Sequence, residues 1–241
     1  VRPSIAEIVA DLDEMLTDAE DLDKARASDE RRSLLNYQLP ESMRDAILRG
    51  VEIKPVPYDE VSLIFTDIVG FTEFSSKRSA EEVRALLHEL HDVAFDPLTT
   101  DHNAFHLETI GDAYICATGF PVDQQDHAAM AVRLAYAMTK AAEPLGLQIR
   151  AGVHSGPAVA TVVGKLRPKL TLLGDTVNAA SRMESISPPG KVTISGVTRD
   201  LLGAATADMT FAPGKIETVK GKGKMKTFVV EGIGFTEADK D

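Results

Sequence analysis

The chain has a single cysteine among its 241 residues and too few basic residues to balance its acidic ones, which gives a net charge of −11. One cysteine, Cys116, cannot form an internal disulfide, and such a sequence fits a reducing compartment. An acidic chain is poorly suited to broad binding of nucleic acid or of an anionic membrane surface, since both require a basic face. The composition therefore excludes a disulfide scaffold and argues against a nucleic-acid-binding protein.

Long apolar runs are missing as well. No stretch approaches the ~20 apolar residues that a membrane-spanning helix requires, and no signal-peptide pattern is present. The apolar content of 44% and the charged content of 26% are those of an ordinary globular protein of one or two domains. Because the sequence begins with valine, we expect a piece of a longer protein, with any upstream sensor or membrane domain outside this chain.

The first fifty residues differ in pattern from the rest. Apolar residues recur there at alternating spacings of three and four, as on the seam of a coiled coil, at Ile5, Ile8, Leu12, Met15, Ala19 and Leu22. Pro40 ends one helix and starts another. We expect residues 1–50 to form a helical dimerisation and transducer segment and residues 51–58 to form a linker. A single amphipathic helix is the alternative to the coiled coil.

From residue 59 to residue 234 the sequence alternates between strand and helix patterns. Two short runs flank Gly111-Asp112, and we expect a hairpin there because both turn residues tolerate positive φ. Strands are predicted at residues 61–65, 105–110, 113–118, 147–154, 158–163 and 226–231. Helices are predicted at residues 80–96, 126–142 and 175–186.

This order predicts the α+β class. The succession β-α-β-β-α-β is that of a ferredoxin-like βαββαβ sheet covered by helices, which we expect on one face. The sheet would be preceded by the N-terminal helical or coiled-coil segment, and residues 235–241 would form a C-terminal tail.

Two aspartates lie at bends beside glycine, each after an apolar run. Asp67 belongs to the run FTDIVGFT and Asp112 to the run LETIGDAY. Two carboxylates at strand ends can hold two divalent cations between them, and two cations with a triphosphate define phosphoryl-transfer chemistry. Either aspartate alone would be a common turn former.

A third segment, LLGDTVNAASRME, supplies polar groups on a predicted helix. Asn178 and Arg182 share one face of that helix because they are four residues apart. Together the three segments resemble the class III nucleotidyl cyclases, the adenylate and guanylate cyclases, over roughly residues 59–234.

The resemblance implies a two-metal reaction. Asp67 and Asp112, helped by the Ile68 carbonyl, would bind two Mg²⁺ or Mn²⁺ ions. Asn178 would position the ribose, and the guanidinium fork of Arg182 would stabilise charge on the transition-state phosphate. The ribose 3′-oxygen would attack the α-phosphorus in line and release pyrophosphate.

The same resemblance identifies contacts to the triphosphate. In the turn at Gly70, Phe71 and Thr72, glycine lets the backbone approach a phosphate, and free N–H groups at a helix start attract anions. Arg150 matches a family arginine that contacts the triphosphate. Lys222 lies in a lysine-glycine loop that resembles the family's phosphate loop, although a solvated basic turn is the alternative there.

Two positions govern the choice of purine in the family, and here they are Glu108 and Thr171. A carboxylate at position 108 can accept two hydrogen bonds from guanine, but it would face the lone pair of adenine N1. The hydroxyl of Thr171 suits either base. We therefore expect a guanylate cyclase that uses GTP, with an adenylate cyclase that uses ATP as the alternative.

The resemblance also implies the assembly. In the family, the aspartates and the Asn/Arg pair of one site come from opposite subunits of a head-to-tail dimer. This chain carries both halves, which implies a homodimer with two equivalent sites. Because nucleotide substrates reside in the cytoplasm, we expect a cytoplasmic domain, whose parent protein is membrane-bound if an upstream anchor exists. A non-catalytic relay module is disfavoured, because such domains usually lose a metal aspartate or the arginine.

Overall fold

The computed structural model describes residues 40–49, 51, 53–164, 169–219 and 223–234. The chain divides into two compact units, Val1–Ile53 and Lys54–Asp241. In the first unit, α2 (Glu41–Leu48) follows Pro40, as the sequence predicts. The expected coiled-coil seam from Ile5 to Leu22, the predicted phosphate contact Lys222 and the tail at residues 235–241 lie outside the described residues.

The second unit is built on one sheet with the strand order β2-β3-β1-β4-β6-β9-β7, to which β5 adds beside β4 and β8 beside β9. The strands are β1 (Val56–Ile68), β2 (Phe105–Ile110), β3 (Ala113–Thr118), β4 (Ile149–Val163), β5 (Lys169–Leu173), β6 (Val192–Ser195), β7 (Met209–Phe211), β8 (Lys215–Val219) and β9 (Gly223–Ile233). The first four form the order β2-β3-β1-β4, in which β1 runs antiparallel to both β3 and β4. This is the predicted ferredoxin-like arrangement.

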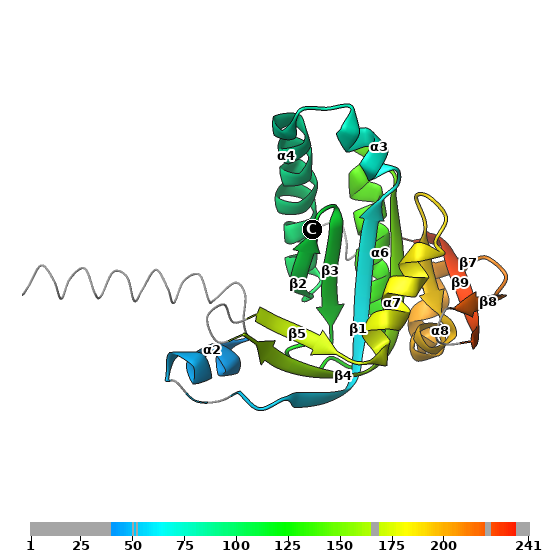
Figure 1. Cartoon of the computed structure of the whole chain (residues 1–241). Coiled ribbons are helices and arrows are strands. Elements are labelled where there is room, and N and C mark those ends of the chain that lie inside the picture. Colours follow the sequence, from blue (N-terminus) through cyan, green and yellow to red (C-terminus); the bar gives the residue numbers. More distant parts are fainter. Residues whose placement is uncertain (1–39, 50, 52, 165–168, 220–222, 235–241) are drawn as a thin grey trace, which may run out of the picture. The chain divides into compact units, whose positions relative to one another are not determined.

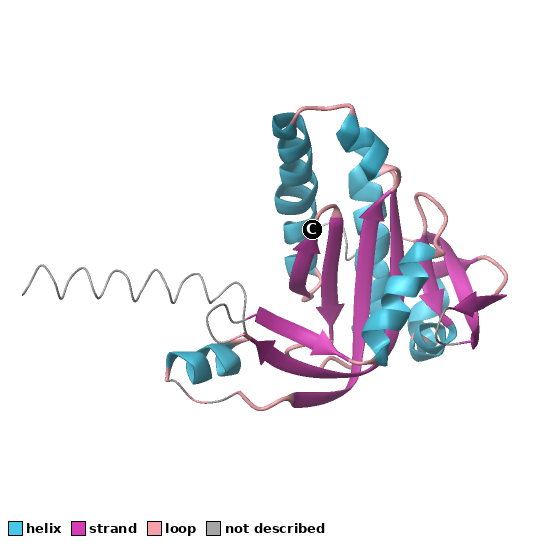
Figure 2. Ribbon diagram, in the orientation of Figure 1, coloured by secondary structure: helices cyan, strands magenta, loops and turns pink. Residues whose placement is uncertain are grey.

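Helices connect and cover these strands (Figure 2). They are α3 (Phe71–Ser76), α4 (Ala80–His88), the π-helix η1 (Glu89–Phe95), α5 (Asp96–Asp101), α6 (His127–Ala142), η2 (Glu143–Leu145), α7 (Asp175–Ser185), α8 (Gly196–Leu201) and η3 (Gly203–Asp208). None of the described helices is long and apolar enough to cross a membrane.

The two faces of the sheet are covered by different helices. Ala151 and Val153 of β4 belong to the core formed with α6. Gly152 between them points the opposite way, because strand side chains alternate between faces. A Cβ at Gly152 would lie 1.8 Å from the main-chain nitrogen of Glu184, so α7 packs directly on that second face. Figure 1 shows α6 behind the sheet and α7 in front of it. The expectation that helices cover one face was therefore wrong.

Several element boundaries also differ from the predictions. The strands expected at residues 147–154 and 158–163 are one strand, β4. The register between β1 and β4 shifts between Tyr58 and Val61, beside Pro157. A β-bulge of this kind accommodates proline, which cannot donate to the ladder. The helix expected at residues 80–96 continues as a π-helix and then as α5.

Candidate active site

The end of β1 and the turn between β2 and β3 bring Asp67 and Asp112 together. Ile68 donates its main-chain N–H to Oδ2 of Asp112, with a distance of 3.2 Å. The pKa of the Asp112 carboxyl is raised, first by burial and then by the neighbouring charge of Asp67. Two carboxylates that repel each other at a strand end fit hard divalent cations, which prefer oxygen ligands. In the described part of the chain, no third His, Cys, Asp or Glu joins these two aspartates in a metal cluster.

Arg150 lies directly opposite Asp67 in the register of β1 and β4. Its Nη2 is 2.5 Å from Oδ2 of Asp67, and its Nε is 3.3 Å from Oε1 of Glu184 on α7. The hydrogen bond with Asp67 raises the pKa of Arg150, while burial raises the pKa of Glu184. Arg150 therefore links one of the two aspartates to α7, and its predicted contact with a triphosphate stays a prediction.

Glu184 is a residue that the sequence analysis missed. Its side chain is 12% exposed and faces Arg150. The available signal was its position in the last turn of α7, because the negative end of a helix dipole disfavours an acidic residue there. A nearby cation can offset this unfavourable interaction, and Arg150 is the cation next to Glu184.

The turn after β1 has the geometry that an anion-binding turn requires. Gly70 has φ of 74° and precedes α3 as its N-cap, without a side-chain cap. Glycine adopts this left-handed conformation at little cost. The helix start at Phe71 and Thr72 leaves main-chain N–H groups available for a ligand.

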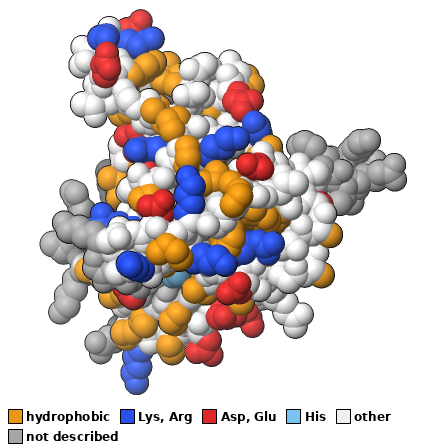
Figure 3. Space-filling model, turned by 90° about the vertical axis from the view of Figure 1, so that its right-hand side faces the viewer, with side chains coloured by type: hydrophobic (Ala, Val, Ile, Leu, Met, Phe, Trp, Pro, Cys, Tyr) orange, Lys and Arg blue, Asp and Glu red, His pale blue; other side chains and the backbone are white. Residues whose placement is uncertain are grey.

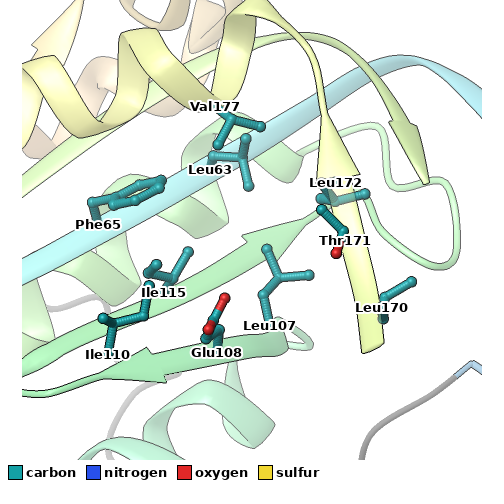
Figure 4. A pocket seen from close by; sticks show the side chains of 10 residues that line it. All are labelled: Leu63, Phe65, Leu107, Glu108, Ile110, Ile115, Leu170, Thr171, Leu172 and Val177. Carbon is teal, nitrogen blue, oxygen red and sulfur yellow. The ribbon is translucent and has the colours of Figure 1, made fainter. Parts of the chain in front are cut away.

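Glu108 and Thr171 line one pocket with a volume of about 230 Å³. The pocket walls are otherwise apolar and come from β1, β2, β3, β5 and α7 (Figure 4); they comprise Leu63, Phe65, Leu107, Ile110, Ile115, Leu170, Leu172 and Val177. A small apolar pocket with two polar groups suits a planar heterocycle whose edge carries hydrogen-bonding atoms. The structure therefore brings together the two residues predicted to read the base.

Lys169 is a second residue that the sequence analysis missed. Its Nζ forms a short ion pair with Oε1 of Glu108. The two residues are 61 positions apart in the sequence, and β5, which carries Lys169, was not predicted as a strand. The pairing of β5 with β4 brings this lysine beside Glu108.

The pocket and the aspartates share the face of the sheet that α7 covers. On β1, Ile64 and Ile68 belong to the core beside α6. Leu63 and Phe65, which line the pocket, alternate with them, and so does Asp67. One face of the sheet thus carries a candidate metal site, a candidate base pocket and the Arg150–Glu184 pair.

Asn178 and Arg182 lie on the side of α7 that points away from the sheet. At 100° per residue they oppose the buried residues of the helix, which are Thr176, Ala179, Ala180 and Met183. Asn178 is exposed and Arg182 is half-buried. Within the described residues, Asp67 pairs with Arg150 and Asp112 with the main chain of Ile68 instead. In the described part of the chain, neither Asn178 nor Arg182 forms a hydrogen bond or an ion pair with these two aspartates.

Charges of both signs are interspersed on the face of the molecule seen in Figure 3. Hydrophobic side chains lie among them on the same face. This face therefore provides no single-sign field for a long polyanion.

Comparison with known proteins identifies relatives of this chain. The family model described as "Adenylate and Guanylate cyclase catalytic domain" matches residues 53–232. Guanylate cyclase D of Mus musculus is 39% identical over 227 residues, which cover 90% of this chain and 20% of that protein. Atrial natriuretic peptide receptor 2 of Homo sapiens is 38% identical over 205 residues, which cover 81% of this chain and 19% of that protein. The chain thus spans about a fifth of the length of these relatives.

Solved structures agree with these matches. The guanylate cyclase domain of RhGC from Catenaria anguillulae, solved in complex with GTP, has 38% identity and a TM-score of 0.69, covering 74% of this chain and 99% of that one. The adenylyl cyclase CyaB from P. aeruginosa has 26% identity and the same TM-score of 0.69, covering 75% of this chain and 97% of that one.

Proposed function

The chain belongs to the family of adenylate and guanylate cyclase catalytic domains, and we propose that it converts GTP to 3′,5′-cyclic GMP and pyrophosphate. The observation that carries this proposal is the shared pocket of Glu108 and Thr171, on the same sheet face as Asp67. The Glu108 carboxylate can accept from both donors on the guanine edge, whereas adenine would present a lone pair to it. The GTP complex of the related Catenaria domain supports the same choice.

Cyclases of this family use divalent cations. We propose that Asp67, Asp112 and the Ile68 carbonyl hold two of them, Mg²⁺ or Mn²⁺, which would activate the ribose 3′-oxygen and neutralise the triphosphate. Side chains and main-chain groups of the protein bind the ribose and the phosphates. Asn178 hydrogen-bonds the ribose, and Arg182 stabilises the charge that develops on the α-phosphate. Arg150 and the N–H groups at Phe71 and Thr72 bind the triphosphate, together with Lys222 outside the described residues.

The first test of this proposal is the stoichiometry of the products. Purified protein with GTP and Mn²⁺ is expected to release cyclic GMP and pyrophosphate in equal amounts, because one bond closes as the other breaks. A chelator such as EDTA should abolish both products. Pyrophosphate without a cyclic product, or turnover that survives EDTA, would contradict the proposal. No product from any triphosphate would instead favour a relay domain without catalysis.

We propose that each site is shared between two subunits of a head-to-tail homodimer. The support is that Asn178 and Arg182 are not buried in α7, while among the described residues Asp67 pairs with Arg150 and Asp112 with the main chain of Ile68. Apolar side chains are also exposed near the pocket, with Ile110 57% and Leu173 49% exposed. Exposed apolar groups beside a site suit a partner surface.

Complementation tests the shared site. Asp67→Ala and Arg182→Ala are each expected to be inactive, and mixing them should restore roughly a quarter of the wild-type rate. The reason is that half of the randomly formed dimers carry one intact site out of two. The matched control mixes Asp67→Ala with Asp112→Ala, which damage the same half-site and should restore nothing. Equal recovery in both mixtures, or in neither, would contradict a site built across the interface.

The domain limits follow from the same proposal. We take residues 59–234 as the catalytic domain and residues 1–50 as a helical segment that strengthens dimerisation and transmits an upstream signal. Because nucleotide substrates reside in the cytoplasm, we propose that the domain lies there as well. An adenylate cyclase remains the second candidate, because Thr171 can also serve adenine.

A further inference from the structure

A second pocket lies on the face of the sheet that α7 covers, and it shares no residue with the base pocket. Its floor comprises Thr193 of β6 and Thr227 and Val229 of β9. Thr193 is paired with Gly152 in the register of β4 and β6, and Gly152 contacts α7. Val230, which alternates with Val229 along β9, belongs to the core on the opposite face. We call this site the β8 pocket, because the strand β8 carries its two charged residues.

The β8 pocket is small, and its walls are largely apolar. Ile186 and Pro188 line it from the segment after α7, and Pro213 lines it from the connection between β7 and β8. Its volume is about 90 Å³, whereas pockets for drug-sized ligands measure roughly 300–1,000 Å³. The pocket therefore excludes a nucleotide and fits a ligand of a few non-hydrogen atoms.

Two opposite charges border the β8 pocket. Lys215 and Glu217 of β8 both line it. Because they are two residues apart on one strand, they point to the same face, and their Cα atoms are roughly 7 Å apart. Among the residues that the structure describes, neither forms an ion pair with the other or with a third residue. A cation and an anion at this spacing can bind the two ends of one small zwitterion.

A buried hydroxyl lies beside the cation. Thr227 is only 4% exposed, and within the described ranges its hydroxyl makes no hydrogen bond to another residue. It lies directly opposite Lys215 in the register of β8 and β9. The hydroxyl of Thr193, in contrast, donates to Oγ of Ser187 at 3.0 Å. Since buried polar groups are generally hydrogen-bonded, the Thr227 hydroxyl suits a ligand that enters the pocket next to the Lys215 ammonium.

We propose that the β8 pocket binds a small zwitterion, an α-amino acid with a short apolar side chain such as alanine. Lys215 and the Thr227 hydroxyl bind its carboxylate, Glu217 binds its ammonium group, and the apolar walls contact its side chain. A simple anion would lie beside the Glu217 carboxylate and a simple cation beside the Lys215 ammonium, and like charges side by side are unfavourable. A ligand with both charges satisfies both residues. The inference does not depend on the proposed cyclase activity.

The test is an NMR titration with alanine of the whole chain, labelled at the methyl groups of isoleucine and valine. We expect saturable shifts at Ile186 and Val229, with a Kd on the order of 1 mM. The methyl groups of Ile110 and Val177, which line the base pocket, should not shift. Acetate and ethylammonium each carry only one of the two charges, so each should bind at least about tenfold more weakly than alanine.

Substitutions at the pocket identify the contacts. Lys215→Met and Glu217→Gln are each expected to weaken alanine binding at least about tenfold, and Thr227→Val, which keeps the shape of the side chain, about threefold. Lys224→Met is the matched control and should leave the affinity unchanged. Lys224 is paired with Thr218, which alternates with Glu217, so it points to the other face of the hairpin.

Three results would overturn the proposal. Shifts that stay linear in alanine concentration would show that no specific site exists. Acetate that binds as tightly as alanine would show a site for anions only. Wild-type affinity in Lys215→Met and Glu217→Gln, in protein whose amide spectrum matches the wild type, would show that the two charges do not hold the ligand.

Discussion

Replacement of Asp112 by asparagine is expected to abolish cyclase activity while leaving the fold at least as stable as in the wild type. The loss should reach about 1,000-fold, because a bound cation supplies several kcal/mol of charge stabilisation and each ~1.4 kcal/mol is a factor of ten. Asparagine has the shape of aspartate and keeps an oxygen that can accept the N–H of Ile68. The fold should therefore survive the change.

The expected stability follows from the sign of the pKa shift. The pKa of Asp112 is raised by burial and by Asp67, so the folded state holds its proton to a higher pH than the unfolded state does. The charged carboxylate consequently costs stability at every pH above that raised pKa. Asp112→Asn removes this cost, and its melting temperature in EDTA should equal or exceed that of the wild type. In the wild type, stability in EDTA should increase as the pH falls through the pKa of Asp112.

Asp101→Asn is the control for this experiment, since Asp101 is an exposed residue at the end of α5. It should change neither activity nor melting temperature. An Asp112→Asn protein that melts well below the wild type would show that the carboxylate serves the fold. An Asp112→Asn protein with near-normal activity would remove Asp112 from the metal site.

Replacement of both residues proposed to read the base is expected to change the preferred nucleotide from GTP to ATP. In the double variant Glu108→Lys with Thr171→Asp, the ratio of kcat/KM for GTP over ATP should fall by at least about 100-fold. Each hydrogen bond to a charged group contributes ~1.5–3 kcal/mol, and guanine loses two acceptors while adenine N1 gains a donor. The measurement is kcat/KM for each nucleotide in Mn²⁺.

Lys169 is the reason why the variant combines two substitutions. Because its Nζ pairs with Glu108, Glu108→Lys alone would place two cations side by side. The added aspartate at position 171 provides a counter-charge on the same strand. Thr171→Asp alone should retain a preference for GTP, since Glu108 remains. A double variant that keeps the wild-type ratio would show that this pocket does not read the base.

Local sequence patterns predicted the parts of the fold that depend on neighbouring residues. The hairpin strands at residues 105–110 and 113–118 are confirmed as β2 and β3 with the same limits. Here Gly111 carries the necessary information, since it has φ of 64°, whereas Asp112 does not adopt the positive φ that the prediction allowed for it. The helix with Asn178 and Arg182 is confirmed to within one residue.

The contacts that tertiary structure creates could not be predicted in this way. The ion pair between Lys169 and Glu108 depends on a short strand that pairs with β4, and no local pattern indicated that strand. The π geometry of η1 depends on packing beneath the hairpin, whereas the apolar spacing fits an ordinary helix. The site residues themselves stay predictions, although the structure places Glu108 and Thr171 in one pocket and Asp67 beside Asp112.

The most direct measurement gives purified wild-type protein equal concentrations of GTP and ATP in one reaction, once with Mn²⁺ and once with Mg²⁺. Both cyclic products are then quantified. With both nucleotides in competition, the product ratio reports the ratio of kcat/KM. We predict that cyclic GMP dominates with either metal, because the Glu108 carboxylate accepts from guanine and opposes adenine N1. Cyclic AMP in equal or greater amount would contradict the assignment of this pocket to guanine.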